Sequence, residues 1–392
     1  MEIKPFQSSK IPCIHFGANT ANGLGRIVSG LGKKALLVRG RSSLSRSGAC
    51  AAIADSLAKA SVEFYEWEIS GEPSPEDIDG AVDANRNRGI DAVLSVGGGS
   101  VIDAGKAISA MLRADGTVAD YLEDVGTRVH PGTKVPFVAV PTTAGTGCEA
   151  TKNAVISKVG PNGFKESLRH DNFMPDVAVV DPGLTVSCPP GISAACGLDA
   201  LTQLLESYVS TKASMLTDLF AQSGLERIRN SLVPACTSAG QDVAVRADLS
   251  YAALMSGMAL ASAGLGVVHG FASSIGGLFA IPHGVVCGVL LAPCLRRTIQ
   301  ALSRTEAGLP HLVKYARAGE ILCARRRGTS RETCDMLIEK IEDYARLLKI
   351  PRLGNYGITA SSIDEIIDKT DNKNNPAKLE KDELRKILME SI

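Results

Sequence analysis

The sequence predicts an α/β domain with a parallel sheet, followed by an all-α domain, and three observations support this. Through residue 186, short apolar runs alternate with helical stretches, which is typical of a parallel sheet covered by helices on both faces. From residue 187 onward, helical periodicity dominates and no run resembles a strand. Pro and Gly punctuate the chain at 188–191. Because 392 residues are too many for one ordinary core, we expect two domains, 1–186 and 187–392.

The elements of the first domain can be placed in order along the chain. A helix should end near 30–32, and a second should start at the Ser-Pro-Glu-Asp sequence of 74–77 and end at Gly89. A third helix should follow the glycine run, over 100–112. The expected strands lie in KKALLVRG (33–40), VEFYEWEIS (62–70), DAVLSVGGGS (91–100), KVPFVAVPTTAGTG (134–147) and DVAVVDPGLT (176–185).

The second domain should consist of helices alone. The periodicity predicts helices over 193–208, 215–230, 243–263 and 271–278, with several more toward residue 392. Residues 249–268 carry no charge, but their Ser, Gly and Ala content makes a poor membrane span. We expect this stretch to be a buried core helix.

Composition excludes some classes of partner. Lys plus Arg and Asp plus Glu both number 42, so the balance does not favour nucleic acid or an anionic membrane. Aromatic residues make up only 4%, which argues against a surface that stacks bases. The ten cysteines form no CxxC pair, and the first residues have no apolar core of a signal peptide. We therefore expect reduced thiols and a cytoplasmic location.

A glycine-rich turn joins an expected strand to an expected helix. Gly97, Gly98, Gly99 and Ser100 would let a phosphate approach the backbone at a helix N-terminus, where free N–H groups and the helix dipole favour an anion. The spacing matches neither GxGxxG nor a P-loop. The alternative is a tight turn without a ligand.

A second polar turn supports the ligand-binding interpretation. Thr142, Thr143 and Thr146 follow another expected parallel strand, and open α/β sheets bind ligands at the edge where such strands end. Two turns of this kind at one edge favour a site for the pyrophosphate or ribose of a dinucleotide.

The end of the strand over 33–40 bears on which dinucleotide is bound. NAD sites usually have an acid here for the ribose 2′-hydroxyl. This chain has Arg39, Gly40, Arg41 and Ser42 instead, and two guanidinium groups favour the 2′-phosphate of NADP(H). The alternative is that both arginines are surface charges, and NAD(H) then remains open.

A lone acid and two histidines in the helical half suggest a metal site. Asp199 lies among small and apolar residues of a predicted helix, with the uncharged Gln203 four residues later on the same face. A buried, unpaired carboxylate is costly, so a positive partner is expected. His269 and His283 lie in an uncharged stretch, and Asp with two His suits Fe²⁺ or Zn²⁺ with an open position. The alternative is that both histidines are ordinary core residues.

Taken together, the motifs GGGSVIDAGKA, PTTAGTGCEAT, DALTQ and VHG…PHG resemble those of the iron-containing (group III) alcohol dehydrogenase family. The resemblance covers nearly the whole chain, including NKNNPAKLEKDELRKIL near the C-terminus. It implies a Rossmann-like domain plus a helical domain, an architecture shared with dehydroquinate synthase, with the active site between them. It also implies hydride transfer between NAD(P)H and a small alcohol or aldehyde, a metal acting as Lewis acid, and a homodimer.

The resemblance also implies roles for single residues. Gly97, Gly98, Gly99 and Ser100 would hold the pyrophosphate, with Asp103 supporting the turn, while Thr142, Thr143 and Thr146 would line the cofactor site. Asn153 and Lys165 would lie toward the ribose and nicotinamide. The metal would be held by Asp199, His269 and His283. Family members that use NADP tend to have glycine at the position of Gly40, in agreement with the interpretation of Arg39 and Arg41.

Two departures from the family pattern leave alternatives open. Gln203 and Ser273 stand where most members have histidine. Gln203 can still be a fourth metal ligand through its neutral amide oxygen, a poorer ligand than imidazole, and the related glycerol dehydrogenases manage with one Asp and two His. A metal-free nucleotide-binding protein or reductase is therefore one alternative. A dehydroquinate-synthase-like lyase is another, but it needs a cluster of basic residues for a phosphorylated substrate, and stretches 196–208 and 264–295 contain no Lys or Arg.

Overall fold

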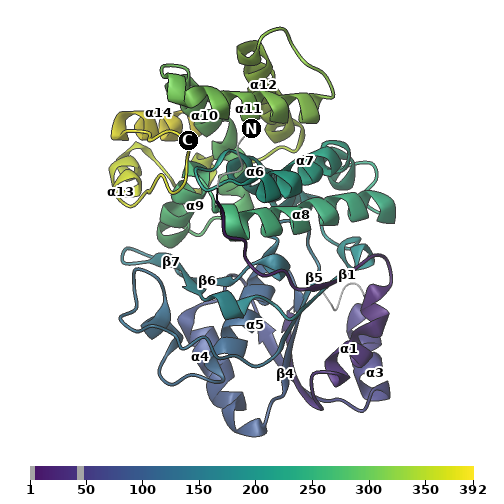
Figure 1. Cartoon of the computed structure of the whole chain (residues 1–392). Coiled ribbons are helices and arrows are strands. Elements are labelled where there is room, and N and C mark those ends of the chain that lie inside the picture. The colour runs from purple at the N-terminus through teal and green to yellow at the C-terminus, as the bar shows by residue number, and fades with distance from the viewer. Residues whose placement is uncertain (1–4, 42–47) are drawn as a thin grey trace.

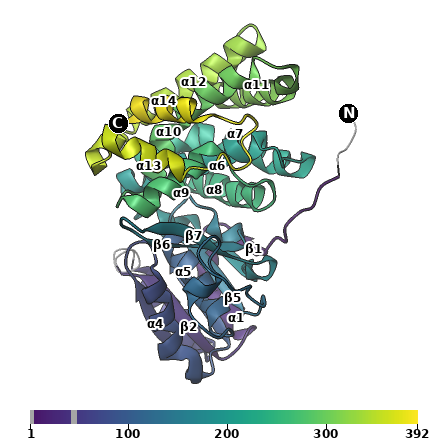
Figure 2. The same cartoon turned by 90° about the vertical axis from the view of Figure 1, so that its left-hand side faces the viewer.

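The computed structural model describes residues 5–41 and 48–392. Figure 1 shows an α/β part and a helical part stacked on one another, so the fold class expected from the sequence is confirmed. Residues 5–12 form an extended segment, which is hydrogen-bonded from Ser9 to Ser262 and Ala261 and projects from the molecule toward the N-terminus (Figure 2).

The α/β part is built on a six-stranded sheet in the order β1-β8-β5-β4-β2-β3, with every pairing parallel. Its strands are β1 (Cys13–Phe16), β2 (Lys34–Gly40), β3 (Glu63–Ile69), β4 (Ala92–Gly97), β5 (Phe137–Pro141) and β8 (Val177–Val180). From β2 the chain runs outward to β3 and then returns to β4 on the other side of β2. The strand order therefore reverses between β2 and β4, and open sheets of this kind bind ligands at such a reversal, beyond the carboxyl ends of the strands.

Helices cover both faces of the sheet, as alternation along β2 requires. Ala35 and Leu37 pack with helices α1 (Leu24–Ser29) and α3 (Ala49–Lys59), whereas Leu36 and Val38 face α4 (Pro75–Asn85) and α5 (Gly99–Met111). The helix α4 begins as predicted, with a capping box between Ser74 and Asp77.

The sequence did not predict three strands of this part. The short strand β1 was missed, and so was an antiparallel hairpin of β6 (Asn153–Lys158) and β7 (Phe164–Arg169). The sequence FKESLR of β7 carries three charged residues, which hid its strand pattern. The hairpin lies between the sheet and the helical part (Figures 1 and 2), where it packs against helix α9 (Val267–Leu278).

The helical part has one continuous apolar core. Its helices are α6 (Pro190–Val209), α7 (Met215–Cys236), α8 (Val243–Ala263), α9 (Val267–Leu278), α10 (His283–Leu302), α11 (Leu309–Cys323), α12 (Ser330–Leu347), α13 (Ile363–Asp368) and α14 (Lys381–Ser391). The expected start of a helix at residue 271 was wrong: α9 begins four residues earlier and includes His269.

Two apolar stretches of this part are long enough to cross a membrane by length and composition. One is α10, and the other is α8 with α9, which meet at a bend of 97°. In α10, 72% of the most apolar window is buried inside the protein. The apolar surface of α10 therefore belongs to the core. The uncharged stretch 249–268 forms the end of α8 and the start of α9, and its residues Leu249 and Val268 belong to the same core.

Candidate metal and cofactor site

Three helices bring the predicted acid and the two predicted histidines together. Asp199 lies in α6, His269 in α9, and His283 is the first residue of α10. Asp199 Oδ1 lies 3.3 Å from His269 Nε2 and 3.6 Å from His283 Nε2. The carboxylate that lacked a partner in the sequence is thus met by two imidazoles, and its side chain is only 2% exposed.

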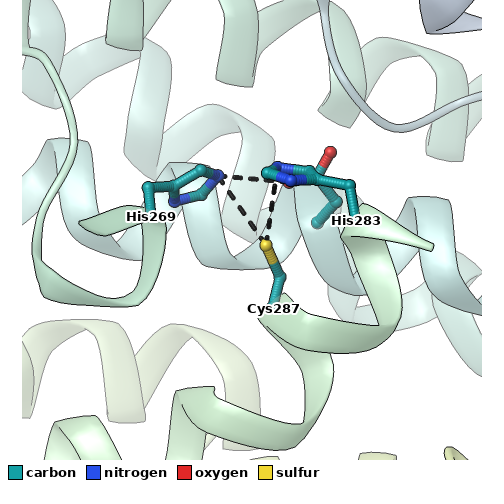
Figure 3. Close-up of side chains that lie close together, drawn as sticks. His269, His283 and Cys287 are labelled. Atoms are coloured by element: carbon teal, nitrogen blue, oxygen red, sulfur yellow. Dashed lines mark hydrogen bonds and ion pairs between the residues drawn. The ribbon is translucent and has the colours of Figure 1, made fainter. Parts of the chain in front are cut away.

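Cys287 completes a group of four possible metal-binding side chains that sequence reasoning missed. Its sulfur lies 3.8 Å from His269 Nε2 and 3.7 Å from His283 Nε2 (Figure 3). The four ligand atoms, including Asp199 Oδ1, all lie within 4.8 Å of one another. The spacing His283-x-x-x-Cys287, which places both side chains on one helix face, could have revealed it.

Gln203 lies beside this group, but its amide oxygen is turned away. Its Nε2 donates to Asp199 Oδ1 at 3.1 Å, and its Oε1 accepts from Ser256 Oγ at 2.7 Å. An amide nitrogen of this kind is a donor and has no lone pair for a metal. Ser273 donates to the backbone oxygen of His269.

Glu206 orients one of the histidines and was also missed. Its carboxylate accepts from His269 Nδ1 and from the backbone N–H of Val268, both at 2.7 Å. With Nδ1 held in this way, Nε2 of His269 faces Asp199 and can serve as a ligand, the arrangement typical of metal-binding histidines. Asp199, Gln203 and Glu206 occupy positions i, i+4 and i+7 of α6, a one-face spacing that could have revealed Glu206.

Burial and mutual charge set the protonation of the group in the absence of a metal. Burial raises the pKa of Asp199, but His283 and the hydrogen bond from His269 lower it more, so the net pKa lies below the ordinary value. Burial lowers the pKa of His269, but the charge of Cys287 and the bonds to Asp199 and Glu206 raise it well above the ordinary value. Burial lowers the pKa of His283 to about 4 and raises that of Cys287 to about 11.

The donor set fits a divalent metal. Two imidazole nitrogens, a carboxylate oxygen and a thiol sulfur are all ligands of Zn²⁺, and imidazole also suits iron. The Nε2 atoms of both histidines face the Asp199 carboxylate, so the possible ligand atoms converge on one point.

The two predicted cofactor turns lie in contact with one another. A Cβ atom on Gly98 would meet the side chain of Thr143 at 3.4 Å, and one on Gly99 would meet Thr146 at 2.6 Å. Thr142 N donates to Gly97 O at 2.8 Å, and the buried Thr142 hydroxyl has no partner among the described residues. The glycines thus allow a close approach of two chain segments at the end of β4, beside the reversal in strand order.

The threonine turn also contacts the helix that carries Asp199. A Cβ atom on Gly145 would meet Cys196 of α6 at 2.7 Å, and one on Gly147 would lie 2.6 Å from Gly257 of α8. The predicted cofactor edge of the sheet and the predicted metal-binding helices therefore adjoin one another at the boundary between the two parts.

The remaining predicted cofactor residues lie around these turns. Ser100 is half-buried at the start of α5, and Asp103 of the same helix accepts from the backbone N–H of Val155 in β6. Asn153 donates to Ser167 across the hairpin. Lys165 is buried, forms an ion pair with Glu72 and packs against Gly276 of α9.

The arginines at the end of β2 differ in their surroundings. Arg39 is paired with Glu66 at 2.7 Å and with Glu68 at 2.8 Å, both on the neighbouring strand β3. Gly40 is the buried last residue of β2, and Arg41 is exposed. The prediction for Ser42 falls outside the described residues.

Comparison with protein families finds two matches that together span most of the chain. Residues 12–182 match the family described as iron-containing alcohol dehydrogenase. Residues 193–392 match the C-terminal part of the Fe-containing alcohol dehydrogenase family.

Individual proteins are similar over nearly the full length. An NADPH-dependent butanol dehydrogenase of Clostridium saccharobutylicum is 33% identical over 367 residues, 91% of each chain. An NAD-dependent methanol dehydrogenase of Bacillus methanolicus is 30% identical over 343 residues, 87% of this chain and 86% of the other. The crystal structure of a 1,3-propanediol oxidoreductase superposes with a TM-score of 0.89 at 28% identity, covering 99% of this chain and 100% of that one.

Proposed function

Because the chain belongs to the iron-containing alcohol dehydrogenase family, we propose that it transfers a hydride between NADP(H) and a small alcohol or aldehyde at a metal held by Asp199, His269 and His283. The observation that carries the proposal is the meeting of these three side chains within 3.6 Å of Asp199 Oδ1, at the boundary with the sheet edge. A bound metal would supply a Lewis acid for the substrate oxygen, and a bound nicotinamide would exchange the hydride.

The chain's own residues would prepare the site in two ways. Glu206 holds Nδ1 of His269, so that Nε2 points toward Asp199, and Gln203 donates to the same carboxylate. Burial of Asp199 and His269 keeps bulk water from these groups, which strengthens their electrostatic effect on a reacting oxygen. In the alcohol–aldehyde reaction the group that gains or loses charge is the substrate oxygen, so these buried groups would act on it.

For the dinucleotide, we propose that the turns at 97–100 and 142–146 bind the pyrophosphate and that Arg41 contacts the 2′-phosphate of NADP(H). The unpartnered hydroxyl of Thr142 and the half-buried Ser100 at the start of α5 support the first part. The absence of an acid at the end of β2, next to Gly40, supports the second. Arg39 would contribute less, because Glu66 and Glu68 already neutralise it. We place Asp103, Asn153 and Lys165 in supporting roles around the same cofactor.

Three broader expectations complete the proposal. The division of the chain at 186/187 falls between the two family matches and just before α6. All ten cysteines are free, which supports a reducing, cytoplasmic location. A homodimer is expected from the resemblance.

Metal analysis combined with a substrate panel tests the proposal. Protein purified without chelator should contain about one Fe²⁺ or Zn²⁺ per chain. It should reduce short aliphatic or aromatic aldehydes with NADPH faster than with NADH, and a chelator should abolish the activity. Turnover that survives complete removal of metal would contradict the metal-dependent mechanism and favour a metal-free reductase.

A further inference from the structure

We propose that Cys287 is the fourth protein ligand of the metal and that Gln203 stays outside the coordination sphere, which makes this a site for Zn²⁺ in preference to Fe²⁺. The proposal rests on the metal site of the proposed function and goes beyond it. By resemblance, the family usually has histidine at the position of Gln203, so a fourth ligand is missing there. Cys287 supplies it from another helix.

Four of the six distances between the ligand atoms are near those of tetrahedral coordination, and all six are within 4.8 Å. With nitrogen and oxygen at about 2.0 Å and sulfur at about 2.3 Å from Zn²⁺, a tetrahedron puts nitrogen and oxygen about 3.3 Å apart, and nitrogen and sulfur about 3.5 Å apart. Asp199 Oδ1 lies 3.3 and 3.6 Å from the two imidazole nitrogens, and Cys287 Sγ lies 3.8 and 3.7 Å from them. The group therefore needs only small movements to hold an ion, and a substrate oxygen would bind as a fifth ligand.

Backbone packing holds Cys287 in this position. His283 and Cys287 are each followed by a glycine in α10, and both glycines face α6. A Cβ atom on Gly284 would lie 2.1 Å from the backbone oxygen of Ala195, and one on Gly288 would lie 2.8 Å from Leu198. Because α10 can approach α6 this closely, both of its ligand side chains reach the carboxylate of Asp199.

The competing ligand, Gln203, is engaged elsewhere. Its oxygen accepts the hydrogen bond from Ser256 and its nitrogen donates to Asp199, so turning the oxygen toward the metal would break both bonds. A thiolate is also a much stronger ligand than a neutral amide oxygen for Zn²⁺. Only one of the four ligands is then a hard oxygen donor, and the site favours Zn²⁺ over Fe²⁺.

Cobalt substitution tests the proposal on the full-length protein. The purified protein is stripped of metal, loaded with one equivalent of Co²⁺, and its absorption spectrum is recorded. We expect a thiolate-to-cobalt charge-transfer band in the near ultraviolet for the unmodified protein. Cys287→Ser should lose the band. It should also weaken Zn²⁺ binding more than does the loss of a residue that is only hydrogen-bonded to a ligand, which costs about 10- to 100-fold. Cys294→Ser, which removes another buried thiol of α10, should change neither.

X-ray absorption of the zinc-loaded, unmodified protein gives a second measurement that needs no variant. A sulfur scatterer at about 2.3 Å is the expected result. Stoichiometric metal bound through nitrogen and oxygen alone, with no charge-transfer band, would overturn the role of Cys287 and leave the proposed function intact. Failure to bind Co²⁺ or Zn²⁺ at all would overturn both.

Discussion

Asp199, Gln203 and Glu206 lie on one face of α6, and each side chain has a different relation to the candidate metal. Asp199 offers the oxygen, Gln203 donates a hydrogen bond to that oxygen, and Glu206 holds the imidazole of His269. All three side chains are buried, so each depends on its partners rather than on water. A change at any of them should therefore be visible in metal binding.

Replacing Glu206 with Ala should weaken metal binding by about 10- to 100-fold, since His269 loses the acceptor that fixes its orientation. Competition against a chromogenic chelator measures the effect. The variant Glu206→Gln, which keeps an oxygen acceptor for His269, should recover part of the affinity. Unchanged affinity in Glu206→Ala would show that packing alone holds the ring.

Replacing Arg41 with Ala should raise the KM for NADPH by about tenfold to a hundredfold, the loss expected for one or two charge-assisted hydrogen bonds to phosphate. The KM for NADH should change little, because NADH lacks the 2′-phosphate. Steady-state kinetics with both cofactors measure this. Arg113→Ala, which removes an exposed arginine just after the C-terminal end of α5, is the matched control. Equal changes for the two cofactors would refute a phosphate contact.

At the scale of elements, the junction between α8 and α9 decides where His269 points. The two helices meet at 97°, and Gly264 at the junction has φ +66° and ψ −173°, a conformation that is essentially restricted to glycine. The C-terminal segment braces the junction, since Asn374 bonds to Leu265 through both its backbone and its side chain. The Asn-Pro segment, far away in sequence, is thereby connected to the junction that precedes His269.

Replacing Gly264 with Ala should destabilise the protein by about 1–3 kcal/mol from backbone strain. The added Cβ atom would also lie 2.5 Å from Nδ2 of Asn374, so the brace must shift and metal affinity should fall as well. Chemical denaturation and metal titration measure the two effects. Gly191→Ala, in the first turn of α6 with nothing within 4 Å, should be neutral or slightly stabilising. A neutral Gly264→Ala would show that the junction is not strained.

At the scale of the whole molecule, the candidate ligands join three helices that are separate in the chain. Asp199, His269, His283 and Cys287 come from α6, α9 and α10, all of which belong to the one core of the helical part. The cofactor turns follow strands of the sheet, whose two faces have cores of their own, although Ala144 of the threonine turn packs in the core of the helical part. The metal, unlike the dinucleotide, would link α6, α9 and α10 directly.

Removing the metal should lower the melting temperature of the helical part. A ligand present at 100 times its dissociation constant stabilises the state that binds it by about 2.7 kcal/mol. Calorimetry of metal-loaded and chelator-treated protein should show this difference, and adding NADPH to the metal-free protein should not restore it. Identical melting curves with and without metal would mean that no ion links the three helices.

The sequence by itself determined the elements and much of the chemistry. Runs such as ALLV in β2 and the cap at Ser74 depend on neighbours close in the chain, and so do the glycine turn at 97–99 and the threonines at 142–146. The resemblance of its motifs to known ones also indicated the protein family. The hairpin β6–β7 was not predicted because its register and burial depend on α9 and α5, which lie elsewhere in the sequence.

Only the tertiary structure decided which side chains surround Asp199. Cys287 and Glu206 carried no signal strong enough by themselves, and Gln203 looked like a ligand until its two hydrogen bonds were seen. The physical reason is that helix periodicity shows which residues share one face of a helix, but it does not show which faces of different helices pack together. That meeting depends on the bend at Gly264 and on the close approach of α10 to α6 at Gly284 and Gly288, contacts between residues far apart in the chain.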